Sequence, residues 1–236
     1  MGIPKMGPVI AIDGPAGTGK SSVTRRLAEA LHFIHVDTGA IYRAVAFLSL
    51  ERLAHPETRS DTVVAEEIAR TVHLEFRRNP EKNPANRIFA NGRDLTDFIR
   101  TQEVTMAASR VSAIPEVRAA LLGLQRRLGC TGRALLEGRD IGTVVFPDAD
   151  IKFFLFASVD ERAKRRLIEL EAAGADAPSF ETVKQQILKR DHGDSTRAVA
   201  PLRKAPDAIE VDTSNMTLDE VVKSMESTAR SRLGLT

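Results

Sequence analysis

Sulfur and aromatic residues are scarce in this sequence, which holds one cysteine, one tyrosine and no tryptophan among 236 residues. A single cysteine, Cys130, excludes a disulfide framework within the chain and is typical of a reducing compartment, so we expect a cytoplasmic protein. Cys130 follows a predicted helical segment and Gly129, a setting that does not favour a nucleophile.

Long apolar runs are also missing. The longest, residues 153–157 together with Ile151, has the length of a strand and is too short to cross a membrane. The first predicted strand begins at Val9, which leaves little room for a signal peptide. We therefore expect no membrane partner.

A strong charge of either sign is absent too, because the formal net charge is only +2. Such a chain has no overall field that would attract nucleic acid, and few aromatic side chains could stack on bases. Charged residues make up 28% and apolar residues 42% of the chain, as in ordinary globular enzymes. We expect no nucleic-acid partner and a monomer.

The most informative stretch that is present lies at residues 14–22, which match the phosphate-binding pattern G-x-x-x-x-G-K-[ST] at every fixed position. An apolar strand pattern precedes it at residues 9–13, and helical periodicity follows it. Glycines let the backbone turn its N–H groups toward a phosphate at the start of the helix. The predicted nucleotide-binding residues are Gly14, Pro15, Ala16, Gly17, Thr18, Gly19, Lys20, Ser21 and Ser22.

Two side chains of this loop carry chemistry. Lys20 supplies a positive charge for the outer phosphates, and the Ser21 hydroxyl is the predicted ligand of Mg²⁺. A glycine-rich turn that binds nothing is the alternative, but the full pattern between a strand and a helix argues against it. The sequence therefore predicts binding of a nucleoside triphosphate.

Strand patterns alternate with helical patterns through most of the chain, which predicts an α/β fold with three layers and helices on both faces of a parallel sheet. The five expected strands cover residues 9–13, 33–37, 133–137, 151–157 and 208–212. Helices are expected from Val23 to Leu31, from Thr38 to about Leu53 and over residues 102–112, 115–128 and 158–173. The 158–173 helix is expected to begin with a capping box of Ser158 and Glu161, and a final helix is capped by Thr217 and Glu220.

Between residues 58 and 102 this rhythm breaks. We expect a short helix from Asp61 to about Thr71, a strand at residues 73–77 and a hairpin around the Asn91-Gly92 turn. The polar stretch of residues 79–86 is predicted to be a loop. This part of the chain is a small antiparallel insertion.

The start of the helix after the second predicted strand is a candidate binding site for a second phosphate-bearing ligand. Thr38, Tyr42 and Arg43 open a helix directly after a strand, although Thr38 could be only a helix cap and Arg43 only a surface charge.

Arg190, Asp194 and Arg197 would share one helix face if their helix continued, but Gly193, Ser195 and Thr196 are poor helix formers. We therefore expect the helix to end near Asp191, with a preceding break over residues 174–178.

The charged segment of residues 189–197 has two interpretations. A solvated surface ion pair contributes only about 0–1 kcal/mol, whereas an arginine that reaches the transferred phosphate raises the rate by about 10³–10⁵. Elsewhere, the five histidines form no metal set. We expect His32 and His35 to be packing or surface residues.

At this point the sequence resembles one family, the bacterial cytidylate kinases. The most specific stretch is Gly138-Arg139-Asp140-Ile141-Gly142-Thr143-Val144-Val145-Phe146-Pro147. The other matching stretches are residues 12–22, 37–43, 99–104, 107–109, 115–118 and 197–202, which together span almost the whole chain.

The resemblance implies transfer of the ATP γ-phosphate to CMP or dCMP, with Mg²⁺, on a nucleoside monophosphate kinase fold. It also implies a single kinase domain with a core of residues 8–57, 103–157 and 205–236, a monophosphate-binding insertion at about 58–102 and a helical lid at about 158–204. No covalent intermediate is expected, because positioning and electrostatics suffice for phosphoryl transfer.

Roles carry over to matching residues. Ser109, Arg118 and Asp140 would face the cytosine, and a carboxylate suits its amino group. Arg190 and Asp194 would lie near the sugar. The residues expected to hold phosphates or the transferred group are Lys20, Arg43, Arg139, Arg190 and Arg197.

The sequence departs from the family pattern at three positions. Thr38 and Glu137 stand where the family usually has Ser and Asp, and Gly193 stands where an extra lid arginine is common. The departure at Gly193 concerns one phosphate contact of the family pattern and leaves the reaction class unchanged. The remaining alternatives are kinases of UMP, AMP or shikimate. A GTPase switch is excluded because neither D-x-x-G nor N-K-x-D occurs.

Overall fold

The computed structural model describes residues 5–54, 60–78, 81, 86–172 and 178–235. These residues form two compact units. The first joins Met1–Val36 to Leu128–Thr236, and the second is Asp37–Arg127.

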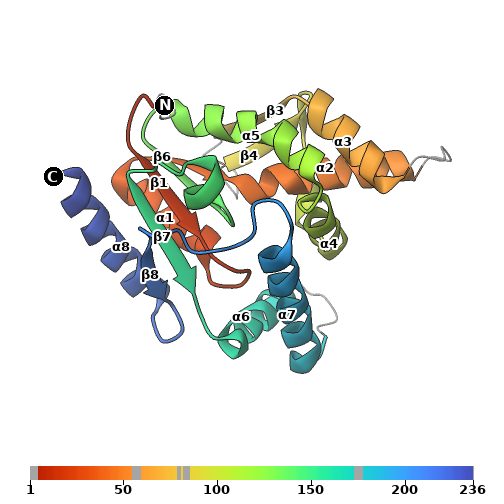
Figure 1. Cartoon of the computed structure of the whole chain (residues 1–236). Helices are drawn as coiled ribbons and strands as arrows, with labels where there is room; N and C mark the ends of the chain where they lie inside the picture. The colour runs from red at the N-terminus through yellow and green to blue at the C-terminus, as the bar shows by residue number, and fades with distance from the viewer. Residues whose placement is uncertain (1–4, 55–59, 79–80, 82–85, 173–177, 236) are drawn as a thin grey trace. The chain divides into compact units, whose positions relative to one another are not determined.

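The first unit is built on a five-stranded sheet with the order β2-β6-β1-β7-β8 (Figure 1). The central strand β1 pairs in parallel with β6 on one side and β7 on the other, and β7 pairs in parallel with β8. This confirms the predicted sheet. The strands in spatial order are β2 (Ile34–Asp37), β6 (Ala134–Gly138), β1 (Val9–Asp13), β7 (Ile151–Phe156) and β8 (Ile209–Asp212).

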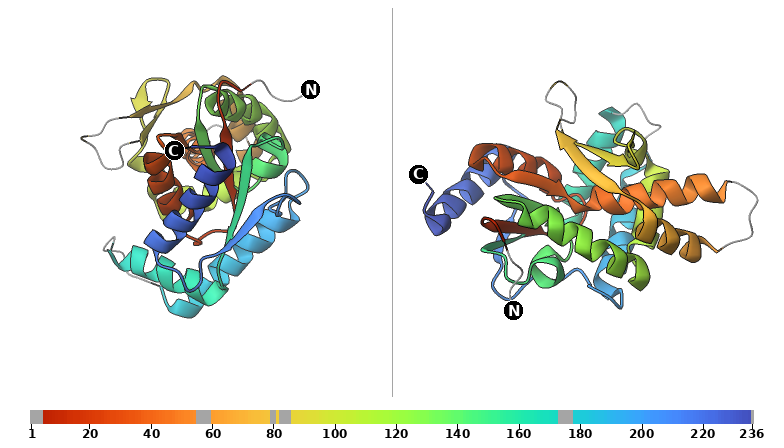
Figure 2. Two further views of the ribbon diagram at one scale, coloured as in Figure 1. Left: turned by 90° about the vertical axis from the view of Figure 1, so that its left-hand side faces the viewer. Right: turned by 90° about the horizontal axis from the view of Figure 1, so that it is seen from above.

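Apolar residues of alternate strand positions form the core on one face of this sheet. Ile10 and Ile12 of β1 pack there with Phe153 of β7 and with helices α1 (Lys20–Leu31) and α8 (Leu218–Leu233). The two helices lie side by side, as the views in Figure 2 show. α8 begins with a capping box in which Thr217 and Glu220 exchange hydrogen bonds, as predicted.

On the other face of the sheet, Leu136 and the ring of Phe146 lie against Gly129, in the last turn of α5 (Pro115–Cys130). An ideal Cβ built on Gly129 would lie 2.5 Å from two ring atoms of Phe146, so only glycine fits there. α5 is two residues longer than predicted, and Cys130 is its last residue rather than a residue beyond it.

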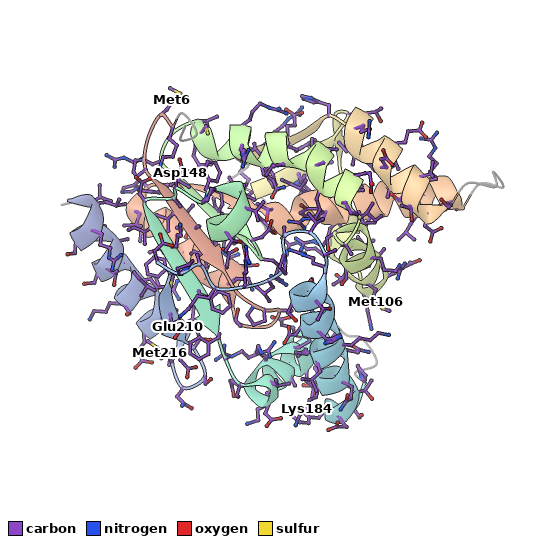
Figure 3. The ribbon with its side chains drawn as sticks, in the orientation of Figure 1. Met6, Met106, Asp148, Lys184, Glu210 and Met216 are labelled. Atoms are coloured by element: carbon purple, nitrogen blue, oxygen red, sulfur yellow. The ribbon has the colours of Figure 1, made fainter. Side chains whose placement is uncertain are left out.

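Helices α6 (Val159–Ala172) and α7 (Phe180–Thr196) form a pair with a small core of their own around Ala163 and Val183. An ion pair joins them on the outside, where Lys184 Nζ lies 2.6 Å from Asp160 Oδ1 (Figure 3). The predicted break at residues 174–178 lies almost wholly outside the described residues.

Two expectations for this helix pair were wrong. Ser158 caps α6 through a bond from the Glu161 N–H, but its own N–H donates to Ser214, so no reciprocal capping box forms. α7 continues to Thr196 instead of ending near Asp191. Its last turn is held by hydroxyl bonds from Ser195 to the carbonyl of Asp191 and from Thr196 to that of His192.

The second unit contains the predicted antiparallel insertion. β4 pairs in antiparallel fashion with β3 and β5, and the β4–β5 turn places Asn91 and Gly92 at φ of 49° and 83°, as an Asn-Gly hairpin requires. The predicted loop at residues 79–86 lies mostly outside the described residues, but Asn86 belongs to β4. The remaining elements are α2 (Thr38–Leu53), α3 (Asp61–Thr71), β3 (Leu74–Arg78), β4 (Asn86–Ala90), β5 (Arg93–Asp94), η1 (Phe98–Arg100) and α4 (Gln102–Val111), followed by most of α5.

Among the described residues, no helix combines the length and the apolar character that a membrane span requires.

Candidate active site

The loop between β1 and α1 has the backbone geometry that a phosphate-binding loop needs. Gly14, Gly17 and Gly19 have φ of 148°, 78° and 83°, which side chains other than glycine rarely adopt. An ideal Cβ on Gly14 would lie 2.0 Å from the carbonyl oxygen of Leu155 on β7, so a larger residue would displace the loop. The N-cap of α1 is Gly19, and no side chain caps the helix there.

Lys20 lies inside this loop and is only 6% exposed. Its Nζ donates to the carbonyl oxygen of Pro15 at 2.5 Å and to Thr18 Oγ1 at 3.3 Å. Burial, followed by the nearby charge of Arg139, holds the pKa of Lys20 well below its ordinary value. A phosphate bound in the loop would supply the negative charge that favours the ammonium form.

Ser21 begins a chain of side-chain bonds that reaches the edge of the sheet. Its hydroxyl donates to Glu137 Oε2 at 2.8 Å, and Glu137 Oε1 lies 2.9 Å from His35 Nε2. Glu137 is 3% exposed at the end of β6. The expectation that His35 is only a packing or surface residue was therefore wrong, because it bonds to a buried carboxylate beside the loop.

β6 ends at Gly138, and Arg139 and Asp140 follow at the carboxyl edge of the sheet. Arg139 Nε donates to Asp194 Oδ2 at 2.8 Å, while Asp140 is buried and lies 3.3 Å from Arg197 Nη2. After Asp140 the chain forms a single π-helical turn, η2 (Ile141–Val145), that the sequence pattern did not indicate. Such turns often occur at functional sites.

Asp13, the last residue of β1, meets this turn. Its two carboxylate oxygens accept from the N–H groups of Ile141 and Gly142 at 2.8 and 2.7 Å. Burial raises the pKa of Asp13 to about 6, against the lowering effect of these two bonds.

The end of α7 contributes the third part of this cluster. Asp194 is buried and lies between Arg139 and Arg197, whose Nη1 is 3.9 Å from Asp194 Oδ1. Burial alone would raise the pKa of Asp194, but the charges of Arg139, Arg190 and Arg197 outweigh it and hold that pKa below its usual value. The positive charge of half-buried Arg190 also lowers the pKa of Lys20.

The first unit thus brings together seven of the predicted side chains within one network around the loop: Lys20, Ser21, Arg139, Asp140, Arg190, Asp194 and Arg197. The other predicted substrate residues belong to the second unit, and they are Thr38, Tyr42, Arg43, Ser109 and Arg118.

Within the second unit, Asp37 caps α2 by accepting from Ala40 N, so Thr38 is not the cap. Asp37 also binds Arg43 through its second oxygen at 2.8 Å. Thr38 is buried at 3% exposure. The possible role of Thr38 as the cap is therefore removed.

A second group in this unit surrounds the ring of Tyr42. The guanidinium carbon of Arg118 lies 5.3 Å from the ring centre, and Gln125 Nε2 donates to the Tyr42 hydroxyl at 3.3 Å. Arg118 also donates to the carbonyl of Ser112, while Ser109 lies half-buried on α4. These contacts fix Tyr42 and Arg118 relative to each other.

Among the described residues, no group of three or more His, Cys, Asp or Glu side chains is placed to hold a metal ion.

The profile of the cytidylate kinase family matches residues 10–231. The chain belongs to the cytidylate kinase family. It is therefore an ATP-dependent nucleoside monophosphate kinase.

Curated relatives agree with this assignment. The cytidylate kinase of Citrifermentans bemidjiense is 47% identical, and that of Geobacter sp. (strain M21) is 48% identical; each alignment covers 96% of this chain and 94% of the relative. A bifunctional pantoate ligase/cytidylate kinase of Synechocystis sp. is 48% identical over 92% of this chain but only 42% of its own length.

Solved structures show the fold alone. An uncharacterized protein from Eubacterium ventriosum is 14% identical, with 95% of this chain and 98% of that chain covered, and aligns with a TM-score of 0.51.

Sequence reasoning missed two arginines of this cytidylate kinase family member. Arg162 of α6 is buried and donates through Nη1 to the carbonyl of Ala16 at 3.1 Å and to Asp191 Oδ2 at 2.6 Å. Arg165 donates to the carbonyl and hydroxyl of Thr213, whose hydroxyl in turn donates to the carbonyl of Thr18. The two arginines are three residues apart on a helix that follows a strand, so they lie on one helix face, and this spacing was the available signal in the sequence.

Proposed function

We propose that this chain transfers the γ-phosphate of ATP to CMP or dCMP, giving ADP and CDP or dCDP. The observation that supports it best is the buried cluster of Arg139, Asp140, Asp194 and Arg197 beside the phosphate-binding loop. A site that binds two anionic substrates needs cationic side chains for their phosphates. To distinguish one base from another, it also needs a fixed carboxylate that accepts hydrogen bonds from the donors of that base.

ATP is the proposed occupant of the loop of residues 14–22. The loop N–H groups would hold the β- and γ-phosphates, and Lys20 would move from the carbonyl of Pro15 to the phosphate charge. We propose that α6 and α7 form a lid over this nucleotide, because Arg162 already contacts the loop backbone at Ala16.

Mg²⁺ fits the residues present. The Ser21 hydroxyl donates a hydrogen bond to Glu137, which leaves the lone pairs of its oxygen available to a cation, and the Glu137 carboxylate adds negative charge nearby. We propose that Ser21 is the direct ligand and that Glu137 orients it. The ion would neutralise charge on the β- and γ-phosphates.

The transfer is a direct in-line displacement. An oxygen of the CMP phosphate bonds to the γ-phosphorus of ATP while the bond from that phosphorus to the β-phosphate oxygen breaks, and ADP leaves. Arg139, Arg190 and Arg197 would stabilise charge on the transferred group. Since the attacking phosphate oxygen is already ionised, no general base is required.

The family resemblance assigns residues of each unit, taken separately, to recognition of the acceptor. In the first unit, Asp140 would accept from the cytosine amino group. In the second unit, Ser109 and Arg118 would donate to polar atoms of the base. Thr38, Tyr42 and Arg43 would bind the CMP phosphate. Arg190 and Asp194 would contact the sugar.

The substitution Asp140→Asn tests base recognition. Uracil lacks the amino group that a carboxylate accepts from, so the variant should lose preference for CMP over UMP by about tenfold to a hundredfold, the value of a hydrogen bond to a charged group. The ratio of kcat/KM for CMP and UMP measures this. Asp219→Asn, at an exposed ion pair with Arg26, is the matched control.

If Asp140→Asn lowers activity while the CMP-to-UMP ratio stays unchanged, Asp140 does not read the base. Its role would then be limited to its contact with Arg197.

The reaction itself is tested by initial rates of ADP formation from ATP with CMP, dCMP, UMP, AMP, GMP and shikimate. CMP and dCMP should have the highest kcat/KM. Equal or faster turnover of UMP, AMP or shikimate would favour the alternative, a kinase of another small acceptor.

A further inference from the structure

Two loops of the first unit, far apart in the sequence, are joined by one buried side chain. Asp13 directly precedes the phosphate-binding loop, and its carboxylate accepts from the N–H groups of Ile141 and Gly142, which directly follow Arg139 and Asp140. Asp13 is 4% exposed. We propose that Asp13 is a positioning residue that holds Arg139 and Asp140 in their working geometry.

Both acceptor atoms of the Asp13 carboxylate are used. The N–H groups of Ile141 and Gly142 open η2, where no preceding carbonyl of that turn is available to them. Each meets one oxygen of Asp13, at 2.8 and 2.7 Å. Only an ionised carboxylate offers two acceptors without a donor, so a carboxamide would leave one N–H facing an NH₂ group.

The η2 turn packs closely against Asp13 and the neighbouring strand β7. Gly142 lies against Lys152 of β7, and an ideal Cβ there would lie 3.1 Å from Lys152 Cδ and 3.4 Å from Asp13 Oδ2. Asp140, immediately before η2, is itself buried with a φ of −142° and ψ of 24°. Its position therefore depends on the turn that Asp13 fixes.

Burial removes water from the Asp13 carboxylate and thereby disfavours its ionised form. Asp140 adds like charge and Lys20 adds opposite charge, while Lys152 lies behind Gly142. Burial raises the pKa of Asp13 to about 6, so the ionised form loses population as the pH falls through that value. If Asp13 positions Arg139 and Asp140, kcat/KM for CMP should therefore decrease at acidic pH.

The inference rests on the proposed function, because it concerns residues assigned there to CMP. The test compares wild type, Asp13→Asn, Asp13→Glu and a matched control, Asp150→Asn. Asp150 is also a carboxylate that accepts from a backbone N–H of β1, at Val9 N and 2.7 Å, but it lies at the opposite end of that strand.

We expect Asp13→Asn to keep ATP affinity within about threefold, by calorimetry, while kcat/KM for CMP falls about a hundredfold, as a misplaced reacting group would cause. Asp13→Glu should recover part of this loss. Asp150→Asn should keep wild-type kcat/KM. As the pH falls through about 6, kcat/KM for CMP should decline more steeply in wild type than in Asp13→Asn, because titration of the CMP phosphate, also near pH 6, contributes equally to both.

An unchanged kcat/KM in Asp13→Asn, an equal loss of ATP and CMP binding, or the same loss in Asp150→Asn would overturn the inference. If neither Asp13 variant folds, binding of cytidine to wild type replaces them, since cytidine has no phosphate to titrate. Binding that weakens from pH 7 to pH 5 supports the inference, and constant binding overturns it. Wild type that is inactive with CMP would instead overturn the proposed function.

Discussion

Lys20 and Asp13 show how burial can be used at the scale of single residues. An unpaired buried charge is costly, and burial moves the pKa of both groups toward the neutral form. Neither effect improves the stability of the empty protein. Both are expected of groups whose charge is needed when a ligand arrives, and perturbed pKa values are common at functional sites.

A first prediction concerns the proton of Lys20. Because burial and Arg139 lower its pKa, and bound phosphate charge would raise it again, ATP binding should take up protons. The uptake should grow as the pH rises toward alkaline values, where the ammonium of the free protein loses its proton. Calorimetry of ATP binding in two buffers of different ionisation enthalpy measures the number of protons exchanged.

The matched variant for this experiment is Lys20→Arg, which remains charged at every accessible pH. In the alkaline range, where the ATP phosphates are already ionised, its ATP binding should show no such proton uptake. The same uptake in Lys20→Arg as in wild type would show that another group is responsible.

Some of these residues could be predicted from sequence and others could not. Lys20 and Ser21 belong to a pattern with fixed spacing, so local sequence was enough to select them. His35 and Glu137 are separated by 102 positions, and Asp13 and Ile141 by 128. Their bonds depend on which strands become neighbours in the sheet, and a single sequence does not indicate which distant side chains this pairing brings into contact.

At the scale of elements, the last turn of α7 is the clearest difference from expectation. Gly193, Ser195 and Thr196 have weak helix propensity, which predicted an early end. In the structure, Asp194 is buried between Arg139 and Arg197, and the N–H of Leu202 donates to the Asp194 carbonyl at 2.8 Å. Tertiary bonds of this kind override propensity, and they keep Arg190 and Asp194 on one helix.

A prediction about stability follows from Gly193. It is exposed in the helix, and no atom lies within 4 Å of an ideal Cβ built there. Gly193→Ala should therefore raise the free energy of unfolding by about 0.5–1 kcal/mol, because alanine loses less backbone entropy. Thermal unfolding should show a midpoint about 2–4 °C higher for a gain of about 1 kcal/mol.

Gly129→Ala is the matched comparison, since Gly129 also lies in a helix but touches the Phe146 ring. Overpacking there should lower the free energy of unfolding by about 1–3 kcal/mol. If both variants shift the midpoint in the same direction, local packing does not decide the effect of these glycines.

The strands and most helices were predictable because their apolar residues repeat with the period of each element. β1 is buried throughout and β7 over most of its length, and both strands carry apolar residues on both faces apart from Asp13 and Lys152. The π-helical turn η2 has no such repeat. Its N–H groups are satisfied by Asp13 from another strand, so local sequence contains no signal for it.

At the scale of the whole molecule, the two units divide the proposed work. The first unit holds the phosphate-binding loop, the helices α6 and α7 that are proposed as a lid, and the Arg139–Asp140 segment, while the second holds the insertion and the residues around Tyr42 and Arg118. The loop alone predicts only that a triphosphate is bound. The choice of acceptor is assigned to the remaining charged residues, and the family assignment agrees with a nucleoside monophosphate as that acceptor.

The most direct measurement of the central claim is a competition for limiting ATP labelled at its γ-phosphate. Equal concentrations of CMP, dCMP, UMP and AMP are mixed with the protein and Mg²⁺, and the labelled products are separated. The proposal predicts that the label enters mainly CDP and dCDP, with UDP and ADP as minor products. Label that accumulates mainly in UDP or ADP would contradict it.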